Sequence, residues 1–163
     1  MIVVSDTSPL RALWKIQHLH LLPALYESVL IPPAVVRELN SFKTSGADLS
    51  ELVNAPWLEI GIIKNKNEVD LLLNDLDPGE AEAIVLAREN NASLILMDEV
   101  AGRNKAEEYG LNVTGVLGVL LEAKKNRLIA EVKPIMDRLI AEARFFISAK
   151  LYSEILSAAN ELK

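Results

Sequence analysis

The sequence contains no cysteine and only two histidines, His18 and His20, which lie in an apolar stretch. Without cysteine the chain has no disulfide bond, no thiol nucleophile and no zinc site built from thiolates. Catalysis centred on histidine would need a partner constellation that is not visible near this pair, so partly buried or surface histidines are the simpler interpretation. Catalysis would therefore have to use carboxylates, hydroxyls, lysines or arginines.

The sequence also lacks an excess of positive charge and any apolar run long enough to span a bilayer. Its 17 lysines and arginines against 23 aspartates and glutamates give a net charge of −6, which argues against a general polyanion-binding domain. A nuclease is compatible with this charge, because acids that bind metal add negative charge and the metal supplies the positive field that meets phosphate. There is no basic-then-apolar leader, and residues 2–4 look like the start of a strand and not like a signal peptide, so we expect a cytoplasmic protein without a membrane segment.

The 163 residues fit a single domain, residues 1–163, and half of them are hydrophobic. Apolar runs suited to buried strands alternate with helical patterns, which predicts an α/β fold with a mostly parallel central sheet and helices on both faces. The expected strands are residues 1–5, 29–31, 58–63, 93–97 and 111–114, the third of them at an edge. The expected helices are residues 8–19, 21–26, 33–39, 68–76, 78–90, 100–109, 117–126, 132–143 and 148–163, with 41–56 as a polar, turn-rich segment.

Three of the expected helices begin with recognisable signals. Ser8 suits an N-cap that is followed by Pro9 at the first helical position. Asp77 and Glu80 suit the two ends of a capping box around Pro78. Ser148 suits the cap of a last amphipathic helix.

Four acidic residues stand after expected strands or on apolar helix faces: Asp6, Glu38, Glu80 and Asp98. Asp6 and Asp98 directly follow two expected strands, and open α/β sheets bind ligands beyond the carboxyl ends of their strands. The two aspartates could meet if those strands are neighbours, although ordinary turn or N-cap roles are the alternative. Glu38 lies on an apolar face, where a carboxylate is costly without a partner. A salt bridge with Arg37 or a solvated helix end is its alternative.

Glu80 and Glu82 are two residues apart on one expected helix, so they point to different faces. Glu80 shares its face with small and apolar residues, whereas the face of Glu82 is more mixed. We therefore prefer Glu80 as the site residue by a small margin, with the capping box as its alternative role.

The four acids form a set of hard oxygen ligands that suits Mg²⁺ or Mn²⁺ and not zinc. Grouped carboxylates repel one another and need cations to be tolerated. In phosphodiester hydrolysis, one or two such ions activate water, orient the phosphate and stabilise developing charge. From spacing alone the set is only suggestive.

Four segments of the chain form a recognisable series: residues 4–10 (Val-Ser-Asp-Thr-Ser-Pro-Leu), 31–39 (Ile-Pro-Pro-Ala-Val-Val-Arg-Glu-Leu), 79–87 (Gly-Glu-Ala-Glu-Ala-Ile-Val-Leu-Ala) and 94–99 (Leu-Ile-Leu-Met-Asp-Glu). In this order they resemble a PIN-domain protein over essentially the full length, most closely a branch related to VapC-type toxins. In that branch the Gly-Glu-Ala-Glu-Ala-Ile stretch replaces the Asp-Ala stretch of the usual toxins.

The resemblance implies a Rossmann-like fold, Mg²⁺ or Mn²⁺ in an acidic pocket, and endonucleolytic cleavage of RNA. Carried over by position, the first to fourth metal acids are Asp6, Glu38, Glu80 and Asp98. Glutamate replaces the usual aspartate at the third position, which affects the metal geometry. Ser8 matches a hydroxyl that helps to orient the first acid or a water. Glu82 and Glu99 are further secondary candidates.

The resemblance also implies partners: an RNA substrate, a small antitoxin protein and a second copy of the chain. The expected RNA contacts are Arg11, Lys15, Arg37 and Arg103, which lie on helices that begin or end near the acids. A homodimer would use the apolar side of the last helix, with Leu151, Ile155 and Leu162, unless that side packs on its own domain.

Three other functions compete with a ribonuclease. A receiver domain would have an adjacent acidic pair early in the chain, whereas Thr7 follows Asp6. A haloacid-dehalogenase phosphatase would have a second aspartate at position 8, where Ser8 stands. The serious alternative is a PIN-like module that binds RNA or protein without cutting it.

Overall fold

The computed structural model describes residues 1–42 and 50–162. Five strands form one sheet in the order β3-β2-β1-β4-β5, and every pairing is parallel. The strands are β1 (Val3–Ser5), β2 (Val29–Ile31), β3 (Leu58–Ile60), β4 (Leu94–Leu96) and β5 (Val113–Thr114). The expected parallel α/β sheet is thus confirmed, with the third strand at an edge.

The strands are apolar because both faces of the sheet are covered. Neighbouring residues of one strand point to opposite faces, so Val3 joins one hydrophobic cluster and Val4 the other. The same alternation places Leu96 in the first cluster and Ile95 in the second. Strands that are buried on both sides need helices on both faces, which explains their continuous apolar runs.

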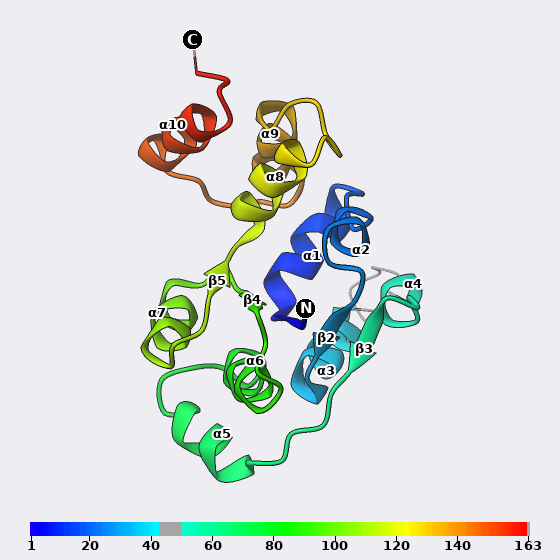
Figure 1. The fold of residues 1–163 in the computed structure, drawn as a ribbon, viewed down its shortest axis with the longest axis vertical. Coiled ribbons are helices and arrows are strands. Elements are labelled where there is room, and N and C mark those ends of the chain that lie inside the picture. The colour runs from blue at the N-terminus through cyan, green and yellow to red at the C-terminus, as the bar shows by residue number, and fades with distance from the viewer. Residues whose placement is uncertain (43–49, 163) are drawn as a thin grey trace.

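Helices fill both layers, and those near the C-terminus gather at one end of the molecule (Figure 1). The first cluster takes side chains from α1–α4 and α8–α10, and the second from α5–α7. No helix in the described part of the chain could cross a membrane. The bounds are α1 (Thr7–Lys15), α2 (Leu21–Tyr26), α3 (Pro33–Ser41), α4 (Ser50–Val53), α5 (Lys66–Leu72), α6 (Pro78–Glu89), α7 (Val100–Glu108), α8 (Val116–Lys125), α9 (Lys133–Glu142) and α10 (Ala149–Ala158).

Several boundaries differ from the sequence-based expectation; α1, β3, α5 and α10, for example, end earlier than expected, at Lys15, Ile60, Leu72 and Ala158. Helix α1 begins at Thr7 with Asp6 as its N-cap, so Ser8 and Pro9 fall within the first turn, where backbone N–H groups have no intrahelical partner. Helix α5 begins after Asn65, whose side chain accepts a hydrogen bond from the backbone N–H of Glu68. The expected turn-rich segment 41–56 contains α4, which buries Leu52; its residues 43–49 lie outside the described part.

The last helix uses much of its apolar side within the chain. Leu156 and Ala159 are buried, and Ile155 packs against the same cluster. Leu151 and Leu162 remain exposed, at 38% and 56%. Of the three residues expected at a homodimer contact, Ile155 therefore packs within the chain while Leu151 and Leu162 stay exposed, and dimerisation stays a prediction.

The chain order changes direction between β1 and β4. From β1 the chain continues to β2 and β3 on one side of the sheet, whereas β4 leads to β5 on the other. The carboxyl ends of two such strands border a crevice at the point where open α/β sheets bind ligands. Asp6 and Asp98 lie just beyond these two strand ends.

Candidate active site

Asp6 lies at the carboxyl end of β1, next to the end of β4. Its backbone N–H donates a 3.0 Å hydrogen bond to the carbonyl oxygen of Leu96, two residues before Asp98. The expectation that Asp6 and Asp98 follow neighbouring strands is confirmed by the pairing of Ser5 with Leu96. Only 3% of Asp6 is exposed, so its carboxylate has little access to bulk water.

Burial and neighbouring carboxylates make Asp6 a weaker acid than an ordinary aspartate in the metal-free chain. The pKa of Asp6 is raised to about 8 in total. Burial is the largest cause, repulsion from Asp77, Glu38 and Glu80 adds to it, and a hydrogen bond from the backbone of Thr7 opposes it. A bound cation would reverse the balance, because it stabilises the ionised form.

Gly79 shows how closely Asp6 and Glu38 approach α6. A Cβ atom on Gly79 would lie 2.6 and 2.7 Å from the two carboxylate oxygens of Glu38 and 3.0 Å from Oδ1 of Asp6. Two carboxylates from β1 and α3 thus occupy the space beside the first turn of α6. A side chain at position 79 would displace at least one of them.

Glu38 is half-buried, and burial raises its pKa. The Thr7 hydroxyl donates a hydrogen bond to Oε2 of Glu38. Among the candidate acids, Glu38 is thus the one with a hydroxyl contact in the described structure, and Thr7 supplies it. Ser8, the expected hydroxyl, instead lines a cavity with Asp98 and Glu99.

Glu80 is both a helix cap and a site candidate. Its Oε1 accepts a 3.1 Å hydrogen bond from the backbone N–H of Asp77, while its own N–H donates to Oδ1 of Asp77 at 2.8 Å. Its Oε2 is buried without a hydrogen-bond partner in the described structure. A Cβ atom on Gly102 would lie 2.8 Å from this oxygen, and burial raises the pKa of Glu80.

Glu82 points elsewhere, as its helix position predicts. Its Oε1 accepts a 2.9 Å hydrogen bond from the backbone N–H of Ala34 at the start of α3, and Oε2 contacts Arg37 at 3.4 Å. Glu82 therefore ties α6 to α3, and its carboxylate is engaged away from Asp6.

Asp98 is held by the start of α8. Its Oδ1 accepts a 2.9 Å hydrogen bond from the backbone N–H of Val116, and its buried Oδ2 has no hydrogen-bond partner in the described structure. Burial raises the pKa of Asp98 to about 6, which the Val116 N–H and the Arg103 guanidinium oppose. Arg103 also donates to the carbonyl oxygen of Met97 at 3.0 Å, so it is engaged within the fold.

The donor set suits a hard divalent cation. Two buried carboxylate oxygens without partners, on Glu80 and Asp98, are unusual, because such atoms are normally hydrogen-bonded or bound to an ion. The space beside Gly79 already holds the oxygens of Asp6 and Glu38. Among the described residues, however, no three acidic or histidine side chains converge closely enough to hold an ion as they stand. Asp6 lies close enough to Glu38 and Glu80 to feel their charges, whereas Asp98 stands at the neighbouring strand end, and the four side chains would have to move closer together to hold a cation.

Sequence reasoning missed Asp77 and Thr7. Among the neighbouring charges, Asp77 raises the pKa of Asp6 the most, yet the sequence predicts only a helix cap at this position. The sequence does contain a signal for Asp77: it is the N-cap of α6, and the N-cap of a helix that begins at this edge of the sheet lies near the carboxyl ends of the strands. Thr7 gave no such signal, because its contact depends on where α3 packs.

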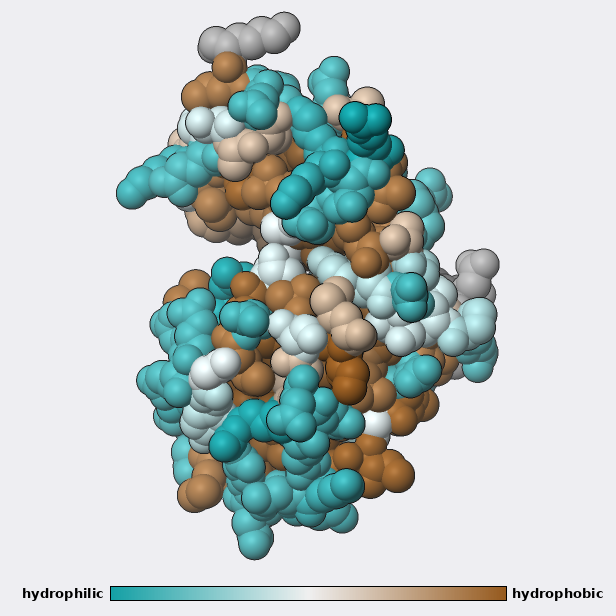
Figure 2. Space-filling model, in the orientation of Figure 1, coloured by the Kyte–Doolittle hydropathy of each residue, from teal (hydrophilic) through white to brown (hydrophobic). Residues whose placement is uncertain are grey.

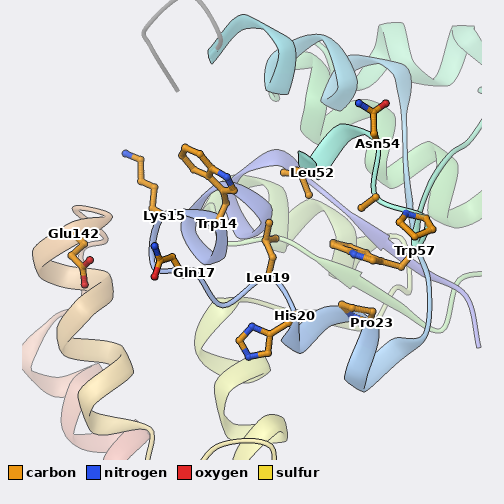
Figure 3. Close-up of a pocket in the computed structure, with 12 residues that line it drawn as sticks. Trp14, Lys15, Gln17, Leu19, His20, Pro23, Leu52, Asn54, Trp57 and Glu142 are labelled. Carbon is orange, nitrogen blue, oxygen red and sulfur yellow. The ribbon is translucent and has the colours of Figure 1, made fainter. Parts of the chain in front are cut away.

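Figure 3 shows the lining of another cavity, of about 1110 Å³. Trp14 and Trp57 line it with Leu19 and Pro23, and Glu142 approaches from α9. None of the four candidate acids belongs to its lining. Lys15 lines both this cavity and the smaller one beside Asp98.

A family model described as PIN domain matches residues 2–161. A PilT N-terminus domain protein from the hyperthermophilic archaeon Sulfolobus solfataricus has a similar structure, with a TM-score of 0.56 and 21% identity. The alignment covers 76% of this chain and 93% of that one, and at this identity it shows the fold alone. No curated protein matches the chain.

Proposed function

Because the chain belongs to the PIN-domain family, generally a nuclease fold, we propose that it is an endoribonuclease dependent on Mg²⁺ or Mn²⁺. The observation that carries this proposal is the gathering of acids around Asp6. Glu38 and Asp6 share the space beside Gly79, and Glu80 and Asp98 each keep a buried oxygen without a hydrogen-bond partner in the described structure.

In this proposal Asp6, Glu38, Glu80 and Asp98 hold the metal, with Ser8, Glu82 and Glu99 in secondary roles. A divalent cation there would lower the pKa of water and stabilise charge on the phosphate. Thr7 fixes the carboxylate of Glu38, and the N–H of Val116 fixes that of Asp98. Burial by the surrounding helices excludes bulk water from Asp6.

The reaction is hydrolysis of a phosphodiester bond. The oxygen of a water adds to phosphorus while the bond from phosphorus to the leaving ribose oxygen breaks. The water loses one proton to solvent, and the leaving oxygen gains one. The chain has no cysteine and only His18 and His20, so in this proposal the carboxylates of the site orient that water.

Cleavage of a labelled RNA panel in Mg²⁺ and in Mn²⁺ tests the proposal. The parent protein is expected to cut, and EDTA or Asp6→Asn to abolish cutting. If the parent and Asp6→Asn proteins cut equally in EDTA, the cleavage comes from a contaminant and the proposal fails.

The alternative is a module that binds RNA or protein without cutting it. The observation that favours it is that the described acids do not yet converge on one point. Binding of RNA by the parent protein, with no cleavage in any divalent metal, would support this alternative.

We also propose that the chain is the toxin of a toxin–antitoxin pair. The support is the likeness of residues 4–10, 31–39, 79–87 and 94–99 to VapC-type toxins. Expression of the chain alone should arrest growth, and co-expression of the small protein encoded beside it should relieve the arrest. Unimpaired growth with an active nuclease would remove the toxin role.

A further inference from the structure

A second feature of the candidate site is a cavity of about 480 Å³ that leads away from Asp98. One wall is α1, with Ser8, Arg11 and Lys15, and the opposite wall is the connection between α9 and α10, with Arg144 and Phe146. Figure 1 shows this connection along the side of the α8–α10 end that faces α7. In Figure 2 the outline of the molecule is indented between that end and the rest. We call this cavity the basic groove.

The basic groove concentrates cations that have no ion-pair partner among the described residues: Arg11, Lys15 and Arg144. The guanidinium of Arg11 lies 4.1 Å from the centre of the Phe42 ring. An aromatic ring carries no net charge, so this contact does not neutralise the charge of Arg11. Elsewhere, carboxylates pair with Arg37, Arg88, Lys105, Lys124, Lys133 and Arg138. Asp98 and Glu99 also line the cavity, at its end beside the candidate active site, so three cations stand against two carboxylates. In a chain of net charge −6, this local excess of positive charge favours an anionic ligand.

The three cations also affect one another. Burial, and then the charges of Arg11 and Arg144, lower the pKa of Lys15. Because like charges repel, placing these three cations around one cavity destabilises the folded chain unless an anion lies between them. The backbone of Arg144, in the connection between α9 and α10, has φ +52°, a conformation that residues other than glycine rarely adopt.

Phe146 supplies an aromatic surface at the mouth of the groove. Its neighbour Phe145 packs against the hydrophobic core, whereas 86% of Phe146 is exposed. A lone exposed aromatic residue needs no explanation. Beside three unpaired cations, however, it completes the pair of features that bind single-stranded nucleic acid: a positive groove for phosphates and a ring on which a base stacks.

We propose that the basic groove binds the backbone of single-stranded RNA through Arg11, Lys15 and Arg144, while Phe146 stacks on one base. This inference rests on the proposed function, because it takes RNA as the substrate. Asp98 and Ser8 line the same cavity, so the strand would enter the candidate active site along α1. A base in a duplex is already stacked on both faces, so Phe146 selects single strands.

The test is the affinity of a short fluorescein-labelled single-stranded RNA, measured by anisotropy in EDTA at several salt concentrations. Phe146→Ala should weaken binding about tenfold without changing the salt dependence. Arg144→Gln and Lys15→Gln should each reduce the slope of log K against log salt by about 0.7. Lys125→Gln is the matched control, because it removes one positive charge outside the groove. Lys125 is the last residue of α8, about 14 Å along the helix from Val116, whose N–H donates to Asp98.

Two further arms separate the possible failures. A duplex RNA of the same sequence should bind Phe146→Ala and the parent protein equally, and a single-stranded DNA shows whether the sugar matters. If the parent cuts and binds RNA but the groove variants match Lys125→Gln, the inference is overturned and the proposed function stands. If the parent neither cuts nor binds, both fail. If it binds through the groove without cutting, only the catalytic proposal fails.

Discussion

The hydroxyl of Thr7 donates a hydrogen bond to Oε2 of Glu38, which joins the first turn of α1 to α3 beside the buried carboxylate of Asp6. Thr7→Val keeps the shape of the side chain and removes the donor. We expect metal affinity and cleavage to fall roughly 10- to 100-fold, because partners that orient ligating carboxylates have effects of this size. Thr7→Ser should retain most activity, since it keeps the hydroxyl. Metal titration by calorimetry checks the result, and unchanged affinity in Thr7→Val would contradict it.

Glu80→Gln and Glu82→Gln should have opposite effects on cleavage. Glutamine still serves at the third position of a capping box, so Glu80→Gln should keep its stability and lose cleavage. Glu82→Gln should retain cleavage, because Glu82 engages Ala34 and Arg37. The measurements are initial rates and melting temperatures. Loss of activity in Glu82→Gln alone would show that Glu80 is only a cap.

Asp6→Asn should abolish cleavage and stabilise the metal-free protein. The amide has nearly the same shape but carries no charge next to Asp77, Glu38 and Glu80. Relief of burial and repulsion worth roughly 1 kcal/mol would raise the melting temperature in EDTA by about 2–4 °C. Added Mg²⁺ should stabilise the parent more than the variant. A lower melting temperature for Asp6→Asn in EDTA would argue against crowded acids.

Gly79→Ala and Gly110→Ala separate a steric effect from a backbone effect. A Cβ atom on Gly79 would lie 2.6 Å from Glu38, so Gly79→Ala should displace that carboxylate and reduce cleavage at least tenfold. Gly110 has φ +77° and nothing within 4 Å of an added Cβ atom. Gly110→Ala should therefore cost roughly 1 kcal/mol of stability and leave cleavage unchanged. Equal activity in both variants would mean that Glu38 has room to move.

Glu161 should make the C-terminal end sensitive to acid. Burial raises the pKa of Glu161, but hydrogen bonds from the backbones of Val132 and Lys133 and from Lys124 outweigh it and lower the pKa below the ordinary 4.5. The stabilisation is therefore present above the unfolded-state value and is lost as pH falls through the folded-state value. Hydrogen exchange in α10 should rise below about pH 4.5 in the parent. Glu161→Gln should show fast exchange already at neutral pH.

The sequence predicted the position of Asp6 and Asp98 well, because parallel strands place their carboxyl ends at one edge. The choice of Glu80 over Glu82 followed from helical periodicity alone. Contacts between distant segments were not predictable. The approach of Asp77 to Asp6 depends on how α6 packs, and the roles of Arg144 and Phe146 depend on a connection without periodicity.

The pairing of β1 with β4 also sets when the candidate site can form. Val3 pairs with Leu94, so the central strand has no partner on one side until most of the chain has been made. Chains fold from the N-terminus as the ribosome releases them, and long-range pairing is slow. A nascent chain that already contains Asp6, Glu38 and Glu80 therefore does not yet have Asp98 positioned beside them. The ribosome that translates this chain, and the message it reads, are exposed to a finished site only after synthesis has passed β4.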